Sequence, residues 1–201
     1  MKKLFTVLAT TLLVACGGGG SDVIDPPVTP PGPPDTVDQW EGRYQACDNG
    51  LQYRYTINGR SDTTFVVQVS YRYLANPNCT GAVITEAVQE LPWQFSAVST
   101  KSDYLYNLED AADYIKTDIT SGMLLKPKQV VRISGPLSGK FTNAEGNECI
   151  GKEKGSYKCF DQDPKEETVD WHLARDGSNF FYDIVYRSNT FNYTLVFKER
   201  D

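Results

Sequence analysis

Alternation of apolar and polar side chains is the dominant pattern over residues 39–201. The apolar positions lie two residues apart in three clear stretches: Tyr53, Tyr55 and Ile57; Val67, Val69, Tyr71 and Tyr73; and Phe191, Tyr193, Leu195 and Phe197. Successive side chains of a β-strand point to opposite faces, so this period predicts strands with one buried face. The chain also contains 12 Tyr, 9 Phe and 3 Trp residues, which pack well on a pleated sheet.

Turn-forming sequences separate the alternating stretches. They include Asn58-Gly59, Ser134-Gly135-Pro136 and Asp176-Gly177-Ser178. Together the two signals predict roughly eight to ten antiparallel strands, after merging of neighbouring stretches. The candidate stretches lie near residues 40–47, 52–58, 63–74, 81–89, 92–98, 128–134, 137–143, 156–160, 167–174, 179–187 and 190–198.

One interval has helical spacing instead. In residues 108–117, the apolar positions Leu108, Ala111, Ala112 and Ile115 follow one another at the spacing of a helix face, beside acidic residues. This pattern predicts a short helix or a turn. The predicted fold class is therefore all-β, an antiparallel up-and-down barrel or a sandwich with one short helix.

The first and last predicted strands carry a further signal. Trp40 and Gly42 lie on the first strand, and Lys198 and Arg200 end the last. In this respect the chain resembles lipocalins, in which a tryptophan beside a glycine on the first strand packs near a basic residue on the last; here the glycine follows the tryptophan. The resemblance implies a lipocalin-like barrel with Arg200 or Lys198 over Trp40, a cation-π contact.

The N-terminus has the order of an export signal. Lys2 and Lys3 precede an apolar run at residues 4–14, which is too short to span a bilayer. Cys16 directly follows Leu13-Val14-Ala15. This order resembles the lipobox of bacterial lipoproteins and, with the rest of the chain, lipoproteins of Gram-negative bacteria. The resemblance implies a signal peptide at residues 1–15, a lipidated Cys16 and a lipid anchor in the bacterial cell envelope, with Gly17 favouring the outer membrane.

Residues 16–38 are rich in glycine and proline and have few large apolar side chains. Such a composition does not fold, and it predicts a tether between the lipid and a single β-barrel-like domain at residues 39–201. The formal net charge of the chain is −6. An acidic chain without basic clusters is not expected to bind nucleic acid.

Four cysteines remain in the domain: Cys47, Cys79, Cys149 and Cys159. An even number in an exported protein predicts two disulfides. Four cysteines allow three pairings, and proximity in sequence favours Cys47 with Cys79 and Cys149 with Cys159. A zinc site is the alternative, but no two of these cysteines have the close spacing that structural zinc sites use.

Catalytic motifs are not found in the sequence. His172 is the only histidine, and no G-x-S-x-G turn accompanies it, so a nucleophilic triad or a multi-histidine metal site is not predicted. The four carboxylates of residues 161–167 are the oxygen donors that calcium prefers, but a solvated acidic turn accounts for them as well. We therefore expect no catalytic residues, no metal and no cofactor.

The interior of the domain is the remaining candidate site. Inward-facing aromatic side chains either fill a small barrel or leave a cavity for one ligand. The candidate lining residues are Tyr53, Tyr55, Tyr71, Tyr73, Phe95 and Tyr193. The leading hypothesis is a non-catalytic binding module for a small apolar ligand or an envelope partner protein. The alternatives are a lysozyme-inhibitor-like protein, whose acidic surface would bind a basic enzyme, and an envelope enzyme that uses paired carboxylates.

Overall fold

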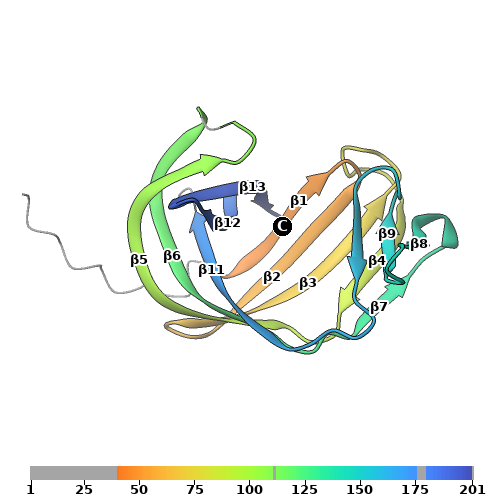
Figure 1. Cartoon of the computed structure of the whole chain (residues 1–201), viewed down its shortest axis with the longest axis horizontal. Helices are drawn as coiled ribbons and strands as arrows, with labels where there is room; N and C mark the ends of the chain where they lie inside the picture. Colours follow the sequence, from red (N-terminus) through yellow and green to blue (C-terminus); the bar gives the residue numbers. More distant parts are fainter. Residues whose placement is uncertain (1–39, 111, 176–179, 201) are drawn as a thin grey trace, which may run out of the picture. The chain divides into compact units, whose positions relative to one another are not determined.

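The computed structural model describes residues 40–110, 112–175 and 180–200 (Figure 1). The predicted signal peptide, Cys16 and the tether lie outside the described residues. The described ranges all belong to one compact unit, residues 31–201. Their elements are β1 (Gly42–Asp48), β2 (Leu51–Ser61), β3 (Thr64–Leu74), β4 (Val83–Gln89), β5 (Trp93–Asn107), β6 (Tyr114–Lys126), β7 (Val131–Ser134), the 3-10 helix η2 (Leu137–Gly139), β8 (Lys140–Thr142), β9 (Glu148–Gly151), β10 (Tyr157–Phe160), β11 (Glu167–Arg175), β12 (Phe180–Arg187) and β13 (Thr190–Glu199).

The all-β fold class is confirmed, since strands make up nearly all of the regular structure in the described ranges. Within the interval 108–117, the described residues before Tyr114 form bends and a turn, and those from Tyr114 onward belong to β6, so the alternative of a helix there is wrong. The Asp110 carboxylate accepts a hydrogen bond from the Ala112 amide at 3.0 Å, a local bond that competes with helix formation. Ile115 pairs with Leu105 across the β5–β6 hairpin, so sheet pairing decides its conformation.

A ten-stranded sheet has the order β12-β11-β6-β5-β13-β1-β2-β3-β4-β7. Two further pairings, β12 with β13 and β5 with β3, bring this order back on itself and make part of the sheet ring-like. Figure 1 shows β5 and β6 curving around β11, β12 and β13. The first and last strands are neighbours, with Tyr44 opposite Glu199. β13 pairs with three strands in all: it is antiparallel to β1 and β12 and parallel to β5.

The apolar side chains gather in two clusters. The larger one, which we call the first cluster, joins buried residues of β1–β4 to one or two buried residues on each of several later strands, among them Phe95, Leu124, Trp171 and Phe197. The smaller, the second cluster, lies among β5, β6, β11, β12 and β13; its buried members are Leu105, Ile119, Ala174, Tyr182, Ile184, Phe191 and Tyr193. Burial of these side chains is the main force that holds the sheet in its curved form.

Both predicted disulfides are present. Cys47 at the end of β1 is bonded to Cys79 in the segment between β3 and β4. Cys149 and Cys159 are bonded across a second, three-stranded sheet of order β10-β9-β8, where they lie directly opposite each other. The second bridge therefore fixes the hairpin that carries β10.

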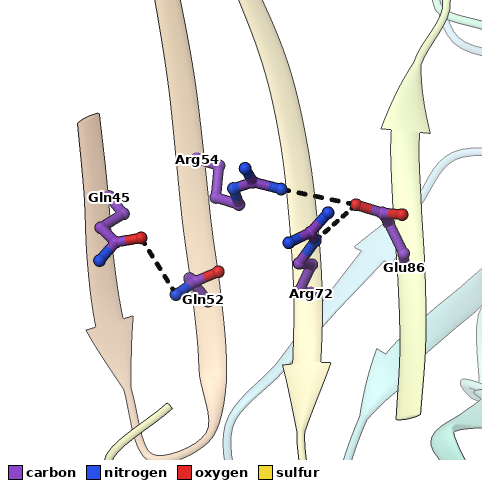
Figure 2. A network of polar contacts seen from close by, with 5 residues as sticks. All are labelled: Gln45, Gln52, Arg54, Arg72 and Glu86. Carbon is purple, nitrogen blue, oxygen red and sulfur yellow. Dashed lines mark hydrogen bonds and ion pairs between the residues drawn. The ribbon is translucent and has the colours of Figure 1, made fainter. Parts of the chain in front are cut away.

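The opposite face of β1–β4 is polar. Glu86 on β4 accepts a hydrogen bond from Arg72 at 2.6 Å and lies 3.7 Å from Arg54. Next to this ion pair, Gln52 donates to Gln45 at 3.3 Å (Figure 2). These side chains alternate along their strands with residues of the first cluster, as the two-residue period predicts. Cross-strand contacts of this kind help to fix strand register.

Candidate ligand-binding groove

The candidate site begins where β11 and β12 separate. The two strands pair from Arg175 opposite Phe181 to His172 opposite Ile184, and the pairing ends there. Beyond that point, residues 169–171 and 185–187 diverge and a hollow of about 520 Å³ opens between them. We call it hollow 1. Aromatic rings of Tyr53, Tyr55, Tyr71, Trp93 and Trp171 contribute to its lining.

A second hollow of about 550 Å³ lies beside it. Its lining includes β10, the segment 161–167 and the ends of β4 and β6. Tyr71, Trp93, Lys126 and Lys158 line both hollows. The two are therefore parts of one groove, and these four residues form its waist.

A partly buried carboxylate, that of Asp183, contributes to the lining of hollow 1. Asp183 accepts a hydrogen bond from the indole Nε1 of Trp171 at 2.6 Å and one from the hydroxyl of Tyr55 at 3.4 Å. Burial raises the pKa of Asp183 above its usual 3.8, and the two hydrogen bonds and Lys126 partly offset that effect. The arrangement fixes the orientation of both rings.

The groove tyrosines remain neutral at physiological pH. Burial is the main cause that raises the pKa values of Tyr53, Tyr55 and Tyr71 above 10.0, and nearby Asp183 raises the pKa of the latter two further. A neutral phenol presents a ring face and a hydroxyl, so these side chains can contact both apolar and polar parts of a ligand.

The two lysines at the waist have different partners. Lys126 forms an ion pair with Glu167 at 2.7 Å, and its ammonium lies 5.5 Å from the ring centre of Trp93. Lys158 lies 5.5 Å from the ring centre of Tyr71, and no carboxylate in the described ranges is within ion-pair distance of it. Burial and the charge of Lys126 lower the pKa of Lys158 below 10.5.

His172 has a partner that the sequence did not reveal. Its Nδ1 lies 2.8 Å from the hydroxyl of Ser121, directly opposite on β6. The ring also packs edge-on against Phe191 at 5.2 Å, and burial lowers the pKa of the imidazole below 6.5. A nucleophilic triad also needs a carboxylate that orients the imidazole, and no such hydrogen bond to His172 is found within the described residues. The pair therefore resembles a cross-strand polar contact.

The structure divides the six predicted lining residues into two groups. Tyr53, Tyr55 and Tyr71 line hollow 1. Tyr73, Phe95 and Tyr193 do not contribute to either hollow. Phe95 is fully buried against Phe65 and Trp171, and Tyr193 belongs to the second cluster, where its hydroxyl donates to Asp113 at 3.2 Å.

Most of the groove residues were missing from the predicted set, among them Trp93, Lys126, Lys158, Trp171 and Asp183. The alternation on β11 indicates that Trp171 faces inward, so the sequence pattern could have placed Trp171 among the lining residues. The lysines and Asp183 carried no such signal because they are isolated charges on different strands. Two of the carboxylates at 161–167 form ion pairs with lysines of the segment 126–128: Asp163 with Lys128 at 3.4 Å and Glu167 with Lys126 at 2.7 Å.

Comparison with known proteins gives no match: no family model, no curated protein and no solved structure is similar to this chain. Within the described residues, no helix has the length and apolar character to cross a membrane. The same part of the chain holds no group of three or more metal-ligating side chains.

Proposed function

We propose that this protein is a lipid-anchored, non-catalytic binding module of the bacterial outer membrane, and that its ligand site is the groove. The observation that supports the proposal best is hollow 1, about 520 Å³ of space whose lining includes five aromatic rings from four strands. Small-molecule sites are concave and mostly apolar, with a few fixed polar groups. The groove is concave and holds fixed polar groups, but polar and apolar atoms share its exposed lining about equally. This composition favours an amphipathic ligand over a purely apolar one.

The proposed location is supported by two independent features. The order of charge, apolar run and Cys16 resembles that of a lipoprotein signal. The two disulfides are typical of proteins that fold in an oxidising compartment such as the periplasm. Replacing Cys16 by serine in the full chain, expressed in a Gram-negative host supplied with radiolabelled palmitate, is expected to abolish labelling of the protein. Absence of label from the parent would contradict the lipid anchor.

Binding at the groove is tested with N-phenyl-1-naphthylamine, a neutral dye whose fluorescence rises in apolar surroundings. Residues 31–201 are used because they form one compact unit. The variant Leu195→Trp places a larger side chain in the lining of hollow 1, and the matched control Val98→Trp changes a side chain that is 69% exposed. We expect the dye to bind the parent and the control and to bind Leu195→Trp at least roughly tenfold more weakly. Equal binding by both variants, or no binding to any of the three, would overturn the proposal.

One observation favours a second candidate, an envelope enzyme. Asp170 and Asp183 both line hollow 1, and burial raises the pKa of Asp183. Two carboxylates in different environments are the usual acid and base of glycoside hydrolysis. Hydrolysis of a panel of nitrophenyl glycosides by the parent, lost in Asp183→Asn, would establish this activity. No release of nitrophenol above the rate of the variant would exclude it for those substrates.

A further inference from the structure

We infer that the ligand of the groove is an organic anion, with its carboxylate or phosphate between Lys126 and Lys158 and its apolar body in hollow 1. This inference rests on the proposed function, since it names the chemical class of the molecule that the groove takes. It is based on the positive charges of Lys126 and Lys158 at the waist and on the apolar side chains that line hollow 1.

The waist brings together two ammonium groups from distant parts of the chain. Lys126 ends β6 and Lys158 lies on β10 of the small sheet, and both contribute to hollow 1 and to the second hollow. Each ammonium lies 5.5 Å from the centre of a different aromatic ring of the groove, Trp93 and Tyr71 respectively. A group bound at the waist therefore meets both cations and both rings.

The positive charge at the waist is only half compensated. Lys126 has Glu167 as its partner, at 2.7 Å. Lys158 is partly buried, and its ammonium lies over the ring face of Tyr71. Within the described ranges it forms no ion pair with a carboxylate. Removing an ammonium group from water without a counter-charge is unfavourable. An anion at this position would supply the missing counter-charge to Lys158 and relieve its repulsion from Lys126.

Other charged groups also face the groove. Asp183 accepts hydrogen bonds from Trp171 and Tyr55. Asp163 pairs with Lys128, and Lys165, Asp161 and Asp170 complete the charged lining. The carboxylates disfavour an anion elsewhere in the groove, so the waist is the position at which a negative group is attracted.

The lining of hollow 1 shows why the anion is organic. Next to the waist it presents the aliphatic side chains of Leu124, Val169, Ile184, Val185 and Leu195, in addition to the aromatic rings. Inorganic phosphate would leave this surface in contact with water, whereas an acyl chain or an aromatic body would cover it, at roughly 25 cal/mol for each Å² buried.

The experiment compares two dyes that differ by one charged group. 1-Anilinonaphthalene-8-sulfonate is N-phenyl-1-naphthylamine with a sulfonate added. Residues 31–201 are titrated with each dye, as the parent, as Lys158→Met and as the control Lys152→Met, which changes an exposed lysine outside the groove lining. We expect the parent to bind the sulfonate more tightly than the neutral dye. Lys158→Met should weaken sulfonate binding about tenfold relative to Lys152→Met, as for loss of one charge-assisted contact, and should weaken neutral-dye binding by much less.

The outcomes separate the two proposals. Binding of neither dye overturns the proposed function. Equal affinity of the parent for the two dyes, or equal sulfonate binding by Lys158→Met and Lys152→Met, overturns the inference and leaves the groove as a neutral-ligand site. Displacement of the bound sulfonate by decanoate or by decyl phosphate identifies which anion the waist accepts. Displacement by decanol at the same concentration would show that the charge is not recognised, and would also overturn the inference.

Discussion

Removal of each disulfide gives a quantitative test of what holds this domain together. Cys47 and Cys79 are 32 residues apart, and Cys149 and Cys159 are 10 residues apart. If a disulfide acts by restricting the unfolded chain, its effect grows with the logarithm of the loop length. This relation gives about 3.7 kcal/mol for the longer loop and about 2.7 kcal/mol for the shorter.

The perturbation is a pair of double variants, Cys47→Ala with Cys79→Ala and Cys149→Ala with Cys159→Ala. Alanine is chosen because Cys149 is fully buried, where the hydroxyl of serine would lose its contacts with water. The free energy of unfolding of each variant and of the parent is measured by urea titration, followed by tryptophan fluorescence. We expect both variants to fold and the variant that opens the longer loop to lose more stability, by about 1 kcal/mol.

Two results would refute this reasoning. A loss below about 1 kcal/mol for the longer loop would mean that the unfolded chain is not what the Cys47–Cys79 bond restricts. A larger loss for the shorter loop would mean that native packing around Cys149 outweighs loop closure. The slope of the urea titration distinguishes a change in the unfolded state from a change in native stability.

Three further predictions concern other parts of the fold. Glu86→Gln is expected to lower the free energy of unfolding by roughly 1–3 kcal/mol, because Arg54 and Arg72 lose the carboxylate that they share. The control Glu90→Gln, in the more exposed pair with Arg132, should change the free energy of unfolding by less than about 0.5 kcal/mol, and urea titration measures both variants. Gly122→Ala is expected to destabilise the folded domain by roughly 1–3 kcal/mol, because a Cβ at this position would overlap the backbone oxygen of Ser96. Thermal unfolding measures the effect, and an unchanged midpoint would contradict the close approach of Gly122 to Ser96. For Asp183 the pKa is raised above 3.8, so the stability that its protonated carboxyl contributes is fully present below that pH and is lost as pH rises through the folded-state pKa. Asp183→Asn should remove this decline of the melting temperature above pH 3.8, and a pH profile identical to that of the parent would contradict it.

Much of the sheet could be predicted because its strands have one polar and one buried face. β3 follows this rule over nearly its whole length and β2 follows it as far as Asn58. Their polar side chains Gln52, Arg54 and Arg72 join Gln45 of β1 and Glu86 of β4 in the contacts of Figure 2. The second half of β5 and the whole of β6 were not predicted. Over residues 99–107 only Leu105 is buried, so the period that indicates a strand is missing there.

The groove was harder to predict than the sheet. The prediction placed Tyr53, Tyr55 and Tyr71 in one lining, and the register of β2 with β3 does bring them together. The space in front of them arises from the divergence of β11 and β12, a property of strand pairing that no local pattern encodes. Lys126 and Lys158 meet only through that tertiary arrangement, which is why isolated charges gave no signal.

The last strand, β13, shows most clearly what the two-residue period cannot predict. Phe191, Tyr193, Leu195 and Phe197 alternate without interruption and predict a single buried face. In the structure the first two belong to the second cluster, while Leu195 and Phe197 belong with the first. The change falls at a register shift, where Asp183 pairs with Leu195 and Ile184 with Tyr193.

A shift of this kind redirects the side chains that follow it. Here the register shift allows side chains of β13 to join both clusters. The shift lies where the pairing of β11 with β12 ends. Hollow 1 lies at this boundary, where Asp183 and Leu195 line it together. The groove is therefore a consequence of dividing one sheet between two cores, and a ligand bound there would contact the residues that join them.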